Sequence, residues 1–203
     1  MTSLVAGYIT TSDEIPAEPK SVNIPDHSHK VDAICKEKIF SRLTRVEGRA
    51  WVIKQDNIDT DMIFHNRYLS ITDINEMGQY TFDNLKGYEK FAKKAKPGDI
   101  VIVGKNFGAG SSRQQAVDCF KSLGISVIIA ESFGSIYERN AINSAMPILI
   151  SKEIVNKVND GDEIIVDFLK GKIIDKTQKK SYLAKPFSKS QLEIYKRGGL
   201  LIS

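Results

Sequence analysis

The sequence is poor in the residues that build metal sites and disulfide frameworks. Its 203 residues include only two cysteines and three histidines. Cys35 and Cys119 form no CxxC pair, and His27, His29 and His65 do not have zinc-finger or helix-face spacing. We therefore expect neither a disulfide framework nor a metal site built by this chain alone.

Long apolar runs are also missing. The longest, around residues 127–130 and 147–150, fall far short of the roughly 18 to 20 residues that a membrane span needs. The first acidic residues, Asp13 and Glu14, precede the first basic residue, Lys20. That order is unlike a secretory signal or a transit peptide. We expect a cytoplasmic protein with no membrane partner.

The formal net charge of +4 comes from one end of the chain. Basic and acidic residues balance up to residue 150, so the excess lies within residues 151–203. Lys176, Lys179 and Lys180 lie there in a polar turn region without interleaved aromatic residues. This pattern is typical of a solvated surface rather than a nucleic-acid groove. No nucleic-acid partner is expected.

The hydrophobic share of 41% is enough to bury a core. Residues 1–45 carry three prolines and no clear periodicity, so we interpret them as an N-terminal extension with a short helix over about 31–43. Residues 46–203 are expected to form one domain. Within it, residues 56–84 are dense in turn formers and predict a long ordered loop, with a possible helix after Thr72.

Strands and helices alternate from residue 97 onward. Short connections between them imply parallel strand pairing, and a hairpin is expected near the C-terminus. The predicted fold class is α/β, with a mixed, mainly parallel sheet, flanking helices, and a C-terminal hairpin and helix. The expected strands are 48–53, 100–103, 127–130, 147–150, 163–168 and 172–174, and the expected helices are 112–123, 132–144 capped by Ser132, 151–158 capped by Ser151, and 188–196 capped by Ser188 and closed by Gly198-Gly199.

The most informative segment is the glycine-rich stretch GKNFGAGSSRQQ at residues 104–115, between a predicted strand and a predicted helix. Glycines permit close backbone approach to a ligand, and free N–H groups at a helix start favour an anion. Nucleotide fingerprints do not fit, because Arg113 stands where a third glycine would be and Lys105 is not followed by Ser or Thr.

Two interpretations of this stretch compete. Ser111 with Gln114, or Ser112 with Gln115, would form a capping box, which explains the serines without any chemistry and is preferred on spacing alone. It does not explain Arg113. The helix dipole disfavours a cation in the first turn by a few tenths up to roughly 1 kcal/mol unless an anion compensates. Arg113 therefore indicates an anionic ligand, either a carboxylate or a phosphate.

These residues closely resemble the swivelling domain of the aconitase superfamily. The motifs are NFGAGSSR at 106–113, IIAESFGSIYERN at 128–140, DTD at 59–61 and YLSI at 68–71. The likeness runs from about residue 48 to 150 and returns in the last helix. In particular, the chain looks like the separate small subunits of 3-isopropylmalate dehydratase and its homoaconitase relatives.

The resemblance implies the small subunit of a hydro-lyase, which removes water from a hydroxy di- or tricarboxylic acid and adds it back at the neighbouring carbon. It implies a large-subunit partner that carries a 4Fe-4S cluster on three cysteines. The leading expectation is 3-isopropylmalate dehydratase, of leucine biosynthesis. Aconitase, homoaconitase and 2,3-dimethylmalate or citraconate hydratases are alternatives. From another class, a non-catalytic anion- or RNA-binding module stays open.

The resemblance also implies roles for particular residues. Ser111 is similar to the serine whose alkoxide removes the proton from the carbon next to a carboxylate. Arg113 and Ser112 would hold a substrate carboxylate, and Asp61 would belong to the polar network around Ser111. From the residues alone, a turn-forming Asx side chain is the preferred interpretation of Asp61.

Substrate choice is expected to depend on the loop Tyr68-Leu69-Ser70. In relatives its third residue is arginine where the substrate has an extra carboxylate and apolar where it has an isopropyl group, and Ser70 matches neither. Arg67 places a cation beside the loop. It could bind a third carboxylate by charge-assisted hydrogen bonds, or it could be a surface or subunit-contact arginine.

Overall fold

The computed structural model describes residues 2–5, 8–11, 42–152 and 154–201. They belong to two units, which divide after Lys38. In the first, β1 (Thr2–Val5) and β2 (Tyr8–Thr11) form an antiparallel pair. Sequence patterning assigned no element to these residues. The helix expected over 31–43 lies almost wholly outside the described residues.

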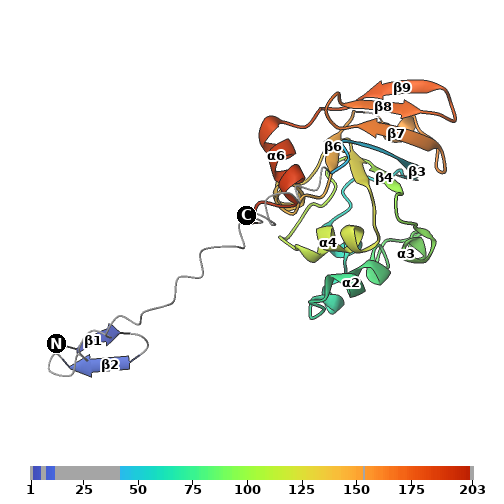
Figure 1. Ribbon diagram of the computed structural model, residues 1–203. Helices are drawn as coiled ribbons and strands as arrows, with labels where there is room; N and C mark the ends of the chain where they lie inside the picture. Colours follow the sequence, from blue (N-terminus) through green and yellow to red (C-terminus); the bar gives the residue numbers. More distant parts are fainter. Residues whose placement is uncertain (1, 6–7, 12–41, 153, 202–203) are drawn as a thin grey trace, which may run out of the picture. The chain divides into compact units, whose positions relative to one another are not determined.

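The second unit is built on a seven-stranded sheet in the order β6-β5-β4-β3-β7-β8-β9 (Figure 1). The neighbouring strands β3, β4, β5 and β6 are parallel, whereas β7 pairs antiparallel with β3, β8 with β7, and β9 with β8. The expected α/β class with a C-terminal hairpin is confirmed, and β9 adds a strand that was not predicted. The strands are β3 Arg45–Ile53, β4 Ile100–Val103, β5 Val127–Ala130, β6 Ile148–Ile150, β7 Glu163–Asp167, β8 Lys172–Asp175 and β9 Lys180–Leu183.

Most helices of the described residues are short, and three of those are single 3-10 turns. The stretch expected to be a long loop, residues 56–84, instead contains two short α-helices and two 3-10 turns. No helix among the described residues is long and apolar enough to cross a membrane. The helices are α1 Thr60–Ile63, α2 Ile74–Met77, α3 Phe91–Lys94, α4 Gln115–Ser122, α5 Ser135–Asn143 and α6 Lys189–Arg197, with 3-10 turns η1 Asn66–Tyr68, η2 Gly78–Tyr80 and η3 Ile154–Asn156.

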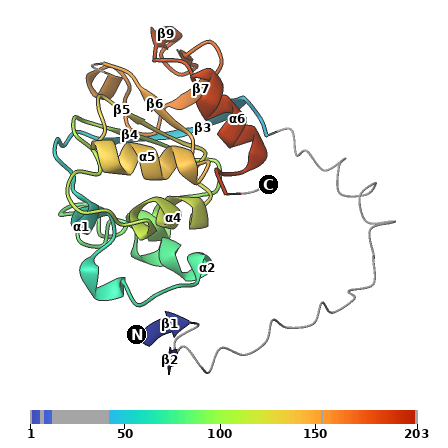
Figure 2. The same cartoon turned by 90° about the vertical axis from the view of Figure 1, so that its left-hand side faces the viewer.

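Both faces of the parallel strands are buried. Val101 and Val103 face one apolar cluster, whereas Ile100 and Ile102 face another, and all four are fully buried. This explains their continuous apolar run, because a strand covered on both faces has no polar side. In both views α2 and α4 lie on the opposite side of β3–β6 from β7–β9 (Figures 1 and 2).

Two of the expected helix caps are wrong. The Ser132 hydroxyl does not cap α5, whose N-cap is Gly134, but accepts a hydrogen bond from the Asn106 N–H at 2.8 Å. The Ser151 hydroxyl donates to the Leu183 carbonyl at 2.7 Å, and only a 3-10 turn follows it. In both cases a tertiary partner competes successfully with local capping. Ser188 does cap α6, and the C-cap of that helix is Gly198, with φ +96°.

A pair of carboxyl groups lies at the base of the β7–β8 hairpin. Asp175 is fully buried, and its Oδ2 has no hydrogen-bond partner among the described residues. Burial and the charge of Asp162 raise the pKa of Asp175. Burial acts to raise the pKa of Asp162 as well, but hydrogen bonds from Gln178 and the Asn159 N–H lower it below its usual value.

Asp175→Asn is expected to stabilise the protein at high pH. Because the folded state raises the pKa of Asp175, its stabilisation is full below the ordinary carboxyl pKa and is lost as pH rises through the folded value. The asparagine is uncharged, and its amide can donate to Asp162. We expect the free energy of unfolding of the variant to exceed that of the wild-type protein by about 1 kcal/mol at pH 8. At about pH 4 the two free energies should be equal. Urea denaturation at both pH values measures this, and a variant less stable at both would contradict it.

Candidate active site

The segments that follow β3, β4 and β5 meet at one edge of the sheet, because parallel strands place their carboxyl ends together. Asp59 pairs with Ala109, and Phe107 pairs with Phe133, as isolated parallel bridges. The Gly108 N–H also donates to the Ile58 carbonyl at 2.8 Å. The glycine-rich loop is therefore held by the backbone on both sides.

Two glycines of these loops are required by packing. Gly108 has φ +74°, and a Cβ there would lie 2.2 Å from the ring of Tyr137. A Cβ on Gly134 would lie 2.8 Å from the Gly108 carbonyl oxygen. The sequence had suggested that the loop glycines admit a ligand. At Gly108 and Gly134 they instead admit a tyrosine ring and the neighbouring backbone.

The helix after the loop begins later than predicted. α4 begins at Gln115, and its N-cap is Gln114, which makes no side-chain capping bond. The capping-box interpretation of Ser111 and Ser112 is therefore wrong. Arg113 precedes the helix, so it does not oppose the helix dipole within a first turn.

Arg113 has an anionic partner within the chain. Its Nη1 donates to Asp61 Oδ1 at 2.5 Å and to the Phe64 carbonyl at 3.2 Å. The Arg113 side chain is only 16% exposed, and that of Asp61 is 34% exposed. The two residues that sequence reasoning placed in one site are thus in direct contact. The anion that Arg113 indicated is in part supplied by Asp61 itself.

Asp61 is the centre of a small polar network. Burial acts to raise its pKa, but hydrogen bonds from Arg113 and from the Asn66 N–H outweigh this and lower the pKa below its usual value. Asn84 Nδ2 donates to Asp61 Oδ2 at 3.3 Å, and His65 Nε2 lies 3.9 Å from the same oxygen. The turn-forming role considered for Asp61 falls to its neighbour Asp59, which caps α1.

The two serines are exposed and differently held. The Thr60 hydroxyl donates to the Ser111 carbonyl at 3.1 Å, which fixes the Ser111 backbone. Within the described residues, no hydrogen bond occupies the Ser111 hydroxyl. Asn140 Nδ2, on α5, donates to Ser112 Oγ at 3.2 Å. The Ser111 hydroxyl is therefore available to a substrate or a partner chain, whereas Ser112 is oriented by α5.

Arg67 and Tyr68 share one carboxylate that the sequence did not indicate. Arg67 Nη2 and the Tyr68 hydroxyl both donate to Asp83 Oδ2, at 2.8 and 2.5 Å. The hydrogen bond with Asp83 is the main cause that raises the pKa of both residues. Neither role considered for Arg67 included this ion pair. Leu69 and Ser70, the other residues expected in the loop, are exposed.

Four residues that contact the predicted site residues were not themselves predicted, and some of them had a stronger signal in the sequence than others. Asn140 is the last residue of the motif at 128–140, so the motif included it, but its contact with Ser112 was not predicted. Thr60 lies inside the DTD motif. Asp83 and Asn84 had no signal, because they lie in a stretch without periodicity or a motif and reach the site only through the fold.

The residues of this chain do not fit an iron–sulfur cluster of its own. A cluster held by three cysteines needs three thiolates, and the sequence has two cysteines. Cys119 is buried, and burial raises the pKa of its thiol to about 12, so it stays protonated at neutral pH. The described part of the chain also holds no group of three His, Cys, Asp or Glu placed to bind a metal.

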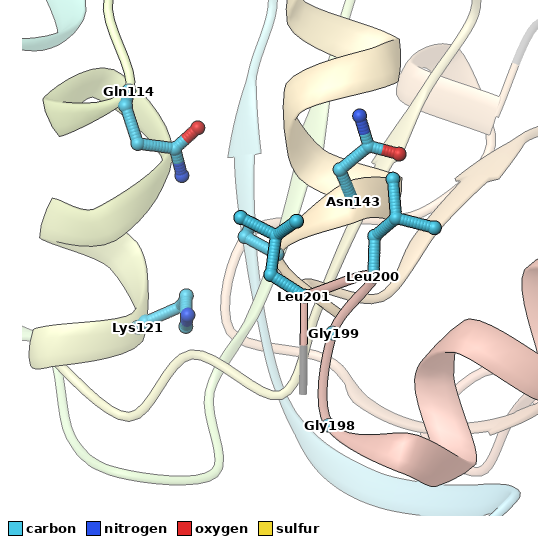
Figure 3. A pocket seen from close by; sticks show the side chains of 8 residues that line it. Gln114, Lys121, Asn143, Gly198, Gly199, Leu200 and Leu201 are labelled. Atoms are coloured by element: carbon cyan, nitrogen blue, oxygen red, sulfur yellow. The ribbon is translucent and has the colours of Figure 1, made fainter. Parts of the chain in front are cut away.

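A cavity of about 530 Å³ lies next to the loop. Figure 3 shows Gln114, the N-cap of α4, and Lys121 of α4 on one side and Asn143, Leu200 and Leu201 on the other. Gln114 directly follows Arg113, but Ser111, Ser112 and Arg113 do not line the cavity. Ser111 and Ser112 are exposed beside this cavity's wall residue Gln114, whereas the Arg113 side chain is mostly covered.

Comparison with known proteins identifies the family of this chain. The sequence profile of the aconitase C-terminal domain matches residues 40–153, which include the three loops and the strands that hold them. The chain belongs to the aconitase C-terminal domain family. The resemblance drawn from the motifs is thereby confirmed.

Individual relatives place the chain within the family. The 3-isopropylmalate dehydratase small subunit 1 of Archaeoglobus fulgidus is 44% identical over 76% of this chain and 93% of that protein. The methanogen homoaconitase small subunit of Methanothermobacter thermautotrophicus is 40% identical over 77% of this chain and 88% of that protein. A crystal structure of a 3-isopropylmalate dehydratase from Methanocaldococcus jannaschii matches with a TM-score of 0.72 and 36% identity, over 77% of this chain and 91% of that chain.

Gly108→Ala is expected to destabilise the domain strongly. The new methyl group would overlap the Tyr137 ring at a left-handed backbone position, so we expect a loss of roughly 3 to 4 kcal/mol in the free energy of unfolding. Gly87→Ala is the matched control, since φ is +88° there but nothing lies within 4 Å of the added carbon. It should cost only about 1 to 2 kcal/mol. Equal losses in the two variants by urea denaturation would refute the packing argument.

Proposed function

We propose that this chain is the small subunit of 3-isopropylmalate dehydratase and acts only with a large subunit that carries the iron–sulfur cluster. The observation that carries the proposal is the exposed Ser111 hydroxyl, two residues before the arginine of the Arg113–Asp61 ion pair, in a chain 40–46% identical to small subunits of that enzyme. Cysteine poverty supports a cluster held by the partner.

In the proposed mechanism, Ser111 is the general base. Its alkoxide removes the proton from the carbon beside a substrate carboxylate while hydroxide leaves the neighbouring carbon. The Ser111 hydroxyl then returns a proton to that neighbouring carbon when hydroxide is added at the carbon that lost its proton. An alkoxide needs nearby positive charge. Because Ser111 lies four residues before α4, the helix dipole contributes little. The guanidinium of Arg113, two residues on, is the cation that this chain offers.

Arg113 would bind the substrate carboxylate while Asp61 keeps it in place. One guanidinium nitrogen, Nη1, is engaged by Asp61 and by Phe64, and the described residues place no hydrogen bond on Nη2. An arginine held in this way can present its second N–H edge to a carboxylate without losing side-chain entropy on binding. Ser112, oriented by Asn140, would donate to the same group.

A homoaconitase-type activity is the second candidate. It is favoured by the 40% identity to the methanogen homoaconitase small subunit and by the cation at Arg67. Against it, Arg67 is already paired with Asp83, and Ser70 offers no charge to a third carboxylate. Assays of the co-expressed subunits with 3-isopropylmalate, citrate, homocitrate and 2,3-dimethylmalate separate the candidates. Turnover of tricarboxylates alone would overturn the leading assignment.

Ser111→Ala is expected to lower kcat of the two-subunit enzyme by roughly 10²- to 10⁴-fold, because it removes the general base, with KM nearly unchanged. Ser126→Ala is the matched control, since Ser126 precedes β5 at the opposite end of that strand from the loops. It should leave both constants as in wild type. A normal kcat in Ser111→Ala would refute the role of Ser111 and would favour a non-catalytic binding module.

A further inference from the structure

Asp83 connects the loop at residues 67–70 to the body of the domain. Its Oδ2 accepts both the Arg67 guanidinium and the Tyr68 hydroxyl, and Tyr68 stacks on Tyr80 with ring centroids 4.0 Å apart. The Arg67 guanidinium also lies 4.8 Å from the centre of the Tyr68 ring. A single carboxylate thus holds two consecutive loop residues.

The environment of Asp83 makes this pair hard to separate. The Asp83 side chain is 20% exposed, and its Oδ1 is buried with no hydrogen-bond partner in the described part of the chain. A partly buried carboxylate with one unpaired oxygen depends on the partners of its other oxygen to balance its negative charge. The positive charge that balances Asp83 comes from Arg67, although the Arg67 side chain is itself 56% exposed.

The segment that contains Asp83 also contacts the polar network around Asp61. Asn84, next to Asp83, donates to Asp61 Oδ2, and Arg113 contacts the Phe64 carbonyl three residues before Arg67. Arg67 therefore lies three residues along the chain from the Phe64 carbonyl that Arg113, the group proposed to bind the substrate, contacts. Its charge, if unpaired, would attract a further carboxylate on the substrate. Paired with Asp83, it offers much less positive potential to such a group.

Resting on the proposed function, we propose that Asp83 is a specificity-determining residue, which neutralises Arg67 and so keeps the site selective for a substrate without a third carboxylate. Asp83 acts through Arg67 and Tyr68 and does not touch substrate. The selectivity is then a property of the ion pair as well as of the loop residue Ser70. Without the carboxylate, Arg67 is free to bind a tricarboxylic acid.

The test uses the co-expressed two-subunit enzyme and the ratio of kcat/KM for homocitrate or citrate to kcat/KM for 3-isopropylmalate. Asp83→Asn is expected to raise this ratio at least about 10-fold, because the isosteric amide releases Arg67. Glu76→Gln, an exposed carboxylate-to-amide change on α2, is the matched control and should leave the ratio unchanged. An unchanged ratio in Asp83→Asn would overturn the proposal.

A double variant identifies the source of the gain. Asp83→Asn with Arg67→Met should return the ratio to the wild-type value, because the released cation is gone. A raised ratio in the double variant would mean that a loosened loop is responsible, which would also overturn the proposal. Tyr68→Phe, which removes one donor but keeps the ion pair, should change the ratio much less than Asp83→Asn.

Arg67→Met alone keeps the proposal testable even if Asp83→Asn folds poorly. It should leave the tricarboxylate ratio as in wild type, because Arg67 is already neutralised, and a fall in the ratio would show that Arg67 already binds a third carboxylate. The wild-type enzyme separates the two hypotheses. Absence of 3-isopropylmalate turnover by the wild-type enzyme refutes the proposed function. The effects of the variants on the ratio test the proposed role of Asp83 in specificity.

Discussion

Parallel pairing of β3, β4 and β5 positions everything that the site contains. Parallel strands that share an edge deliver the segments after them to one place, and here those segments carry Asp61, Ser111, Arg113 and, through α5, Asn140. The glycine-rich loop fits there because Gly108 passes directly against the Tyr137 ring. The geometry of the site therefore depends on backbone contacts more than on any one side chain.

Two ion pairs, Arg113–Asp61 and Arg67–Asp83, then decide the electrostatics of this edge. Each places an arginine beside a carboxylate from a different part of the chain, so neither cation stands free. The pairs differ in burial, since Arg113 is mostly covered and Arg67 is mostly exposed.

The fold was largely predictable because its strands are continuous apolar runs. The residues from 100 to 103 and from 127 to 130 match β4 and β5 at both ends, since a strand buried on both faces leaves an unbroken apolar signal. Helix starts were less predictable. Ser132 and Ser151 have the right chemistry for caps, but each hydroxyl bonds a distant backbone group. The strand β9 was missed because its exposed residues show no apolar alternation.

The sequence by itself determined the family and the loop that carries Ser111 and Arg113. Those conclusions rest on residue identity and local order. Only the tertiary structure decided which charges meet. Asp61 and Arg113 are 52 residues apart, and Asp83 has no motif around it. The energy of an ion pair depends on distance and burial in space, neither of which the order of residues expresses.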